Sequence, residues 1–138
     1  MKAEQFTAVN RPRIVVADDC RDAADALVHL LSLMGYEAKA VYNGREAVEA
    51  CARAHPDLAI LDMEMPVLDG CDAARLIKAA PGPCPWIASL SGAALDTEPL
   101  RSRCQVFDSA LTKPAELSEL AALLQEKAGP PRPQSATH

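Results

Sequence analysis

The sequence has no apolar run long enough to cross a membrane as a helix, so we expect no membrane partner. Its first stretch, MKAEQFTAVNRPR, has no apolar central segment, which argues against a secretory signal peptide. A basic excess is also missing: the net charge is −5, whereas a nucleic-acid-binding surface normally carries a basic patch. Together these absences predict a cytoplasmic protein that binds neither membrane nor nucleic acid.

The sequence also lacks a C-x-x-C pair among its five cysteines, which are scattered and odd in number. That spacing disfavours both a disulfide framework and a zinc site. We therefore expect the cysteines to be reduced thiols that act as small core residues.

Apolar material is abundant, since 49% of the 138 residues are hydrophobic, which is enough for the core of one domain of ordinary size. We expect residues 1–12 to form a flexible N-terminal arm and residues 13–128 to form the domain. From Gly129 onward the sequence GPPRPQSATH is rich in proline, and residues 129–138 are predicted to be a disordered tail.

Five short apolar stretches alternate with stretches of helical periodicity. The expected strands are Arg13–Ala17, Glu37–Tyr42, Asp57–Leu61, Trp86–Leu90 and Ser109–Thr112. The expected helices cover residues 22–34, 43–54 and 69–80, a weaker one 96–106, and a last one that begins at Pro114. This alternation predicts an α/β fold with a mostly parallel sheet and helices on both faces.

Two of these helices carry more detailed expectations. In the first, the apolar face is predicted to hold Ala23, Ala26, Leu27, Leu30, Leu31 and Met34. In the second, Asn43 followed three residues later by Glu46 resembles a capping box at the N-terminus.

Charged and polar residues stand where the predicted strands end. The stretch IVVADDC (14–20) ends the first strand in Asp18 and Asp19, and Asp62 ends the third. The fourth ends at Ser91, and the fifth runs into Lys113. The carboxyl ends of parallel strands meet at one edge of a sheet, where open α/β folds bind their ligands. These five side chains are therefore predicted to form one site.

Three neighbouring carboxylates repel one another unless a cation lies between them. Oxygen ligands of this kind suit Mg²⁺, which often shares its site with a phosphate. A metal ion, the ammonium of Lys113 and the hydroxyl of Ser91 around one acid make a phosphoryl-binding arrangement. Asp62 is the best candidate nucleophile because it ends the middle strand, and a carboxylate can itself form an aspartyl phosphate.

The sequence resembles the receiver domain of two-component response regulators, in particular the single-domain type related to the chemotaxis response regulator. The matching stretches are VVADD (15–19), NGREAVEA (43–50), DLAILDMEMPVLDG (57–70), ASLSG (88–92) and LTKP (111–114). The resemblance covers roughly residues 12–127. It implies a flavodoxin-like, doubly wound fold with five parallel strands in the order 2-1-3-4-5 and five helices.

The resemblance also implies roles for the site residues. Asp62 would accept a phosphoryl group from a sensor or hybrid histidine kinase or a phosphotransfer protein. Asp19, Asp62 and the backbone carbonyl of Glu64 would bind Mg²⁺ directly, and Asp18 would hold the ion through water. Lys113 would pair with Asp62 and with phosphoryl oxygens, Ser91 would donate to one of them, and the bond before Pro114 would be cis.

Three positions depart from the pattern of that family. Ala110 stands three residues before Lys113, where members usually carry Tyr or Phe, and we hypothesise that output here does not use rotation of an aromatic ring. Glu64 adds an acid two residues after Asp62, with an effect whose sign stays open. Val106 replaces a common glycine, which predicts a differently shaped loop before the fifth strand.

The expected function is a phosphorylatable switch that acts through an unknown downstream protein, because we expect no room for an output domain after residue 128. One alternative is a phosphatase that forms an aspartyl phosphate, although Glu64 fits its D-x-D pattern poorly and no lid segment is present. A second alternative is an interaction module that is not phosphorylated. On the leading interpretation the chain is a phosphoacceptor that assists its own phosphorylation and dephosphorylation, not an enzyme.

Overall fold

The computed structural model describes residues 12–65, 67–91, 106–112 and 117–127. Five parallel strands form one sheet in the order β2-β1-β3-β4-β5. The strands are β1 (Arg13–Ala17), β2 (Glu37–Val41), β3 (Leu58–Asp62), β4 (Trp86–Ser91) and β5 (Ser109–Thr112). The described helices are α2 (Arg21–Leu33), α3 (Gly44–Ala54), α4 (Gly70–Ala79) and α6 (Leu117–Lys127). The predicted α/β fold and strand order are confirmed.

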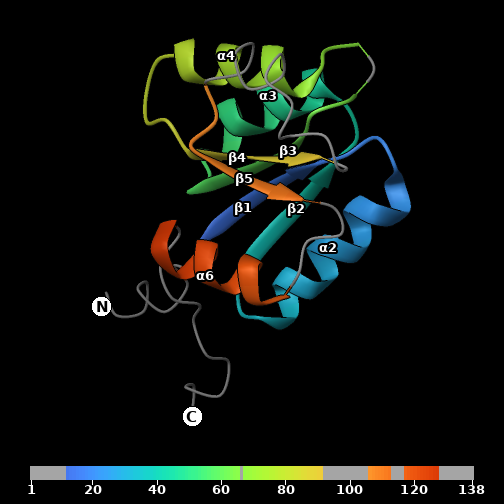
Figure 1. Cartoon of the computed structure of the whole chain (residues 1–138). Coiled ribbons are helices and arrows are strands. Elements are labelled where there is room, and N and C mark those ends of the chain that lie inside the picture. The colour runs from blue at the N-terminus through green and yellow to red at the C-terminus, as the bar shows by residue number, and fades with distance from the viewer. Residues whose placement is uncertain (1–11, 66, 92–105, 113–116, 128–138) are drawn as a thin grey trace.

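The helices form two layers, with α3 and α4 on one face of the sheet and α2 and α6 on the other (Figure 1). Alternate residues of β1 pack against the helices on opposite faces of the sheet. Ile14 and Val16 join the core under α2 and α6, whereas Val15 and Ala17 join the core under α3 and α4. This division follows from the two-residue period of a strand, and it explains why residues 14–17 and 58–61 are apolar without interruption.

Side-chain caps begin two of the described helices, and one of them is the expected cap at Asn43. The Asn43 side chain accepts a hydrogen bond from the backbone N–H of Glu46 at 2.8 Å, and Glu46 Oε1 accepts one from the N–H of Tyr42 at 2.8 Å. Asp69 caps α4 in the same way, by accepting from the N–H of Asp72 at 2.9 Å. These bonds satisfy backbone donors that the first helical turn leaves unpaired.

Two expectations need correction. The buried face of α2 is centred on Ala24 and Leu31, whereas Ala23 and Ala26 are exposed. Cys20, Cys51 and Cys84 are free thiols as expected, but Cys71 is disulfide-bonded, so the prediction that all five cysteines are reduced is wrong.

Several expectations fall outside the described residues: the arm 1–11, most of the weak helix 96–106, the peptide bond before Pro114 and the tail 129–138. None of the helices in the described part of the chain combines the length and apolar character that a membrane-spanning segment needs.

Candidate functional site

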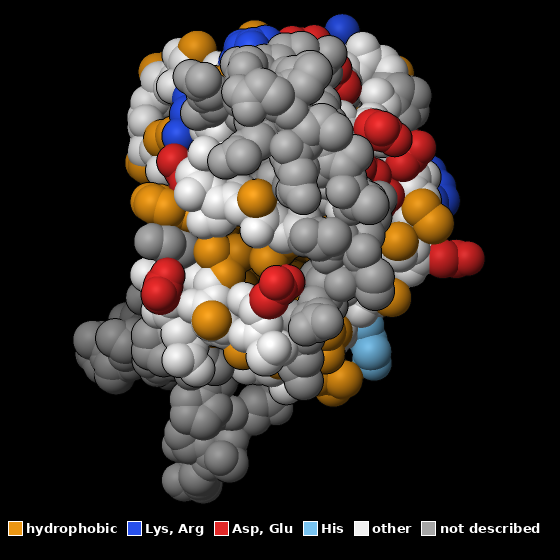
Figure 2. All heavy atoms as spheres, viewed as in Figure 1, with side chains coloured by type: hydrophobic (Ala, Val, Ile, Leu, Met, Phe, Trp, Pro, Cys, Tyr) orange, Lys and Arg blue, Asp and Glu red, His pale blue; other side chains and the backbone are white. Residues whose placement is uncertain are grey.

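The acids predicted to meet at the carboxyl edge of the sheet do so. Ala17 of β1 pairs with Leu61 of β3, which brings Asp18 beside Asp62. One carboxylate oxygen from each of Asp18, Asp19 and Asp62 lies within 4.8 Å of the other two. Figure 2 shows red acidic side chains on several parts of this face, including the right of the view, the side toward which the strand arrowheads point in Figure 1.

Two of the three carboxylates are buried, which makes their proximity costly without a counter-charge. Asp18 is 2% exposed and Asp62 is 3% exposed, while Asp19 is open to solvent. Burial removes the water that would otherwise stabilise each negative charge, and mutual repulsion adds to that penalty. The cluster therefore has the character of a cation site, because a divalent ion would offset both effects at once.

Backbone donors already orient the two buried acids. Asp18 Oδ1 accepts a hydrogen bond from the N–H of Cys20 at 3.0 Å, and Asp62 Oδ1 accepts one from the N–H of Glu64 at 3.0 Å. Both bonds reach two residues along the chain, which is the pattern of an Asx turn. They fix the carboxylates at the edge of the sheet before any ligand arrives.

Close backbone packing holds the loop that follows Asp62. A side chain at Gly70 would place its Cβ 2.3 Å from the carbonyl oxygen of Asp62, so only glycine permits this approach. The N–H of Gly70 donates to the carbonyl oxygen of Met63 at 3.2 Å, and the N–H of Met63 donates to that of Leu90 at 3.0 Å. The start of α4 is thus packed directly against the strand that carries Asp62.

Ser91 ends β4 one residue beyond Leu90, which pairs with Asp62. Its hydroxyl oxygen is buried and has no hydrogen-bond partner among the described residues. Buried hydroxyls are normally hydrogen-bonded, and an unpaired one calls for an explanation. An acceptor oxygen supplied by a ligand at this edge would give it a partner.

The structure also places one of the other site residues predicted from the sequence and two positions that depart from the family pattern. Glu64 is exposed in the loop after β3, and Ala110 is exposed on β5, where it pairs with Ser89 of β4. Val106 is half-buried against the core under α3 and α4. Lys113 lies outside the described residues.

Sequence reasoning missed one polar cluster beside the acids. The Arg21 guanidinium lies 4.0 Å from the ring centre of Tyr42, and the Tyr42 hydroxyl donates to Asp25 Oδ1 at 2.7 Å. The hydrogen bond to Asp25 raises the pKa of Tyr42. The sequence signal for this cluster was the four-residue spacing of Arg21 and Asp25 on one helix. Tyr42 gave no such signal, since it was predicted to be the last residue of a strand, whereas in the structure it lies just after β2.

Known proteins share the sequence features of this chain. The chain matches the family model of the response regulator receiver domain over residues 14–125. It is 33% identical over 120 residues to the regulatory protein AtoC of Escherichia coli, covering 87% of this chain and 25% of AtoC. It is 33% identical over 116 residues to the transcriptional regulatory protein PrrA of Mycobacterium tuberculosis, covering 84% of this chain and 49% of PrrA. The chain thus spans half or less of these relatives.

Solved structures show the same similarity. The receiver domain of a sensor histidine kinase from Pseudomonas aeruginosa, which has a magnesium ion coordinated in its active-site cleft, superposes with a TM-score of 0.74. That pair shares 29% identity over 87% of this chain and 99% of the other. A CheY-like receiver domain from Methylobacillus flagellatus has a TM-score of 0.76 at 24% identity and shares the fold, over 85% of this chain and 98% of the other. The family match extends over most of the sequence, and the chain belongs to the receiver domains of two-component response regulators.

Proposed function

We propose that residues 13–128 act as a Mg²⁺-dependent phosphoryl acceptor, with Asp62 as the residue that becomes phosphorylated. Two observations carry the proposal: the carboxylates of Asp18, Asp19 and Asp62 converge within 4.8 Å of one another, and the buried Ser91 hydroxyl at the same edge of the sheet has no partner among the described residues. The first feature fits a divalent cation and the second fits a phosphoryl oxygen.

The chemistry of the donor set fits Mg²⁺. Asp18, Asp19 and Asp62 offer carboxylate oxygens, and the backbone carbonyl of Glu64 is proposed as a further ligand. Hard oxygen ligands of this kind suit Mg²⁺, whereas a site of soft metals would be expected to use sulfur or imidazole. When bound, Mg²⁺ supplies positive charge that offsets the carboxylates and the phosphoryl oxygens. The magnesium ion in the structurally similar Pseudomonas domain supports this assignment.

The reaction proposed for Asp62 is a phosphoryl transfer from phosphohistidine. An oxygen of the Asp62 carboxylate attacks phosphorus, the phosphorus–nitrogen bond breaks, and the imidazole leaves with its electron pair and takes up a proton. The product is an acyl phosphate on Asp62. The Ser91 O–H then donates to a phosphoryl oxygen, and Lys113 pairs with another, so the chain's main contribution is to position and stabilise charge.

The proposed partners follow from this chemistry. A sensor or hybrid histidine kinase, or a phosphotransfer protein, provides the phosphohistidine. The added charge on Asp62 then alters contacts at the edge of the sheet and so changes binding to a downstream protein. On this proposal the chain assists its own phosphorylation and dephosphorylation and does not turn over a separate substrate.

Incubation with acetyl phosphate and MgCl₂, followed by intact-mass spectrometry, tests the proposal. Wild type should gain the mass of one phosphoryl group, Asp62→Asn should gain none, and chelation of Mg²⁺ should abolish the gain. Asp57→Asn is the matched control, because Asp57 is an exposed aspartate that precedes β3 at the opposite edge of the sheet. A wild-type chain that gains no mass would favour the unphosphorylated interaction module, and steady turnover of a chromogenic phosphate ester would favour the phosphatase.

A further inference from the structure

A groove between α3 and α4 has no role in the phosphoryl-acceptor site. Its volume is about 230 Å³, and its lining consists of four apolar residues and two charged ones: Val48, Val67, Leu68, Leu76, Arg45 and Glu49. Three large hydrophobic side chains are notably exposed in the described part of the chain, and two of them, Val67 at 74% and Leu76 at 49%, line this groove. Clustered apolar exposure of this kind is typical of a protein-binding surface.

The backbone holds Val67 in this exposed position at a conformational cost. Its φ angle is 71°, in the left-handed region that a β-branched residue rarely adopts. The neighbouring wall of the groove is closely packed, because the Leu68 backbone approaches α3 so nearly that a Cβ at Gly44 would lie 1.9 Å from the Leu68 carbonyl oxygen. A strained residue that presents an apolar side chain to solvent indicates a functional surface.

The charges beside the apolar patch indicate what occupies it. Arg45 and Glu49 lie one turn apart on the same face of α3, with Val48 between them. Both side chains are exposed, and neither forms an ion pair or hydrogen bond with another described residue. One positive and one negative charge on either side of an apolar residue form a self-complementary pattern. If α3 met a second α3 in antiparallel orientation, each Arg45 would face the partner's Glu49.

We propose that this groove is the contact surface of a symmetric homodimer, in which two α3 helices pack antiparallel. A two-fold axis near Val48 brings the two apolar patches together and forms two reciprocal Arg45–Glu49 pairs, as an isologous interface requires. The occupant of the groove is therefore a second copy of this chain, which supplies Val67 and Leu76 from the opposite side. The surface is separate from the carboxylate cluster, so the proposal stands or falls independently of phosphorylation at Asp62.

Sedimentation velocity over a range of concentrations up to about 1 mM tests whether this dimer forms. The wild-type chain should associate as its concentration rises, and Leu76→Ser should weaken association strongly. The matched control is Leu33→Ser, because Leu33 is an even more exposed leucine, at 71%, that lies on α2 away from the groove. Both leucines are exposed, so both variants should fold. A wild type that stays monomeric throughout, or equal effects of the two substitutions, would overturn the proposal.

Exchanging the charges of Arg45 and Glu49 tests whether the occupant of the groove is a second copy of this chain. Arg45→Glu and Glu49→Arg should each weaken self-association about tenfold, because each places like charges opposite one another twice in the dimer. The double variant, with both substitutions in one chain, should recover wild-type association. An equimolar mixture of the two single variants should also associate, because an acidic face then meets a basic one. If neither the double variant nor the mixture recovers, the groove does not pair with itself, and a different protein is its occupant.

Discussion

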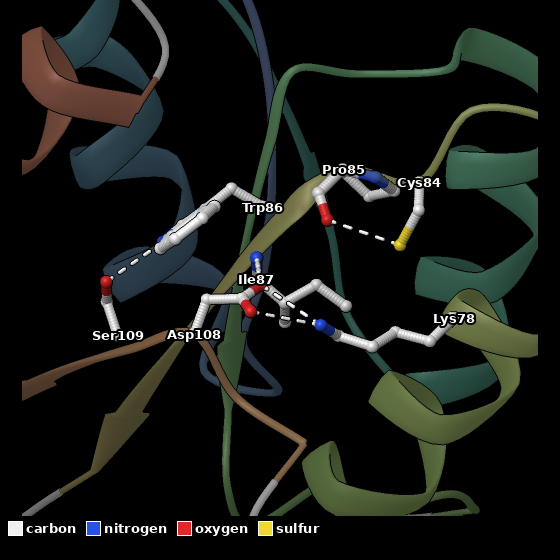
Figure 3. Close-up of polar contacts among 7 residues, drawn as sticks. All are labelled: Lys78, Cys84, Pro85, Trp86, Ile87, Asp108 and Ser109. Atoms are coloured by element: carbon white, nitrogen blue, oxygen red, sulfur yellow. Dashed lines mark hydrogen bonds and ion pairs between the residues drawn. The ribbon is translucent and has the colours of Figure 1, made fainter.

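The two edges of the sheet use acids in opposite ways, with buried acids at the carboxyl edge and an exposed one, Asp108, at the amino edge. At the carboxyl edge, Asp18 and Asp62 are buried next to a third carboxylate, and the Ser91 hydroxyl has no partner among the described residues. At the amino edge, the Asp108 carboxylate accepts hydrogen bonds from the Lys78 ammonium at 3.0 and 3.2 Å. It also accepts one from the Ile87 N–H at 2.8 Å (Figure 3).

Further contacts complete the amino edge. The N–H of Asp108 donates to the Ile87 carbonyl oxygen at 2.7 Å, and Trp86 Nε1 donates to Ser109 Oγ at 2.9 Å (Figure 3). Together these bonds tie α4, β4 and the start of β5 to one another. Polar groups with partners stabilise a fold, whereas neighbouring carboxylates repel one another. The difference teaches that an acid in this fold can contribute to stability, as Asp108 does, or gather with other acids into a candidate ion site, as Asp18 and Asp62 do.

The largest expected effect is the stabilisation by Mg²⁺ at the carboxyl edge. At a concentration one hundred times its dissociation constant, an ion that binds only the folded chain should raise the free energy of unfolding by about 2.7 kcal/mol. Asp19→Asn should remove most of this gain because it removes a proposed ligand. Without Mg²⁺ the same variant should be at least as stable as wild type, because one source of repulsion is gone.

Urea unfolding with MgCl₂ and with a chelator measures both quantities. Asp57→Asn serves again as the control at the other edge, and it should keep the full response to Mg²⁺. If Mg²⁺ stabilised Asp19→Asn as strongly as wild type, the carboxylate cluster would not be the ion site.

A smaller effect, of opposite sign, is expected at the amino edge. Asp108→Ala leaves the Ile87 N–H and the Lys78 ammonium without their acceptor, and should lower the free energy of unfolding by about 2 kcal/mol. Lys78→Met removes only a partly exposed ion pair, and should cost about 0.5–1 kcal/mol. Neither loss should depend on Mg²⁺. Equal losses in the two variants would mean that the backbone contact of Asp108 adds nothing to stability.

The sequence permitted prediction of the fold and of the acid cluster for one physical reason. Parallel strands end at a common edge, so acids that end β1 and β3 must meet once the strand order is known. The tie between Lys78 and Asp108 could not be predicted in this way, since it joins two ordinary charged residues 30 positions apart. Their meeting depends on how α4 packs, which no local pattern encodes.

The buried face of α2 shows a second limit of pattern reasoning. Ala23 and Ala24 are equally apolar, yet only Ala24 is buried, because an alanine fits either a core or a solvent-facing position. The disulfide state of Cys71 was missed for a related reason: scattered cysteines carry no local spacing signal, and their pairing depends on the folded arrangement.

The last expected effect concerns a buried group that stays neutral, in contrast to the buried acids. Burial, with a lesser contribution from nearby Cys84, raises the pKa of the Cys51 thiol from 9.0 to about 12. Above pH 9 the unfolded chain releases this proton while the folded chain keeps it, so the free energy of unfolding falls as pH rises toward 12. Between pH 8 and pH 10, wild type should lose about 1 kcal/mol more than Cys51→Ala does.

Urea unfolding at the two pH values gives this difference. Alkylation by iodoacetamide at pH 8, mapped by mass spectrometry, provides a second measurement on the same thiol. Cys20 and Cys84, which are exposed, should react while Cys51 stays unmodified, because the thiolate is the reactive form and burial suppresses it. Rapid labelling of Cys51 in the folded chain would instead mean that α3 opens locally from the sheet. The close packing of Leu68 against that helix would then not persist in solution.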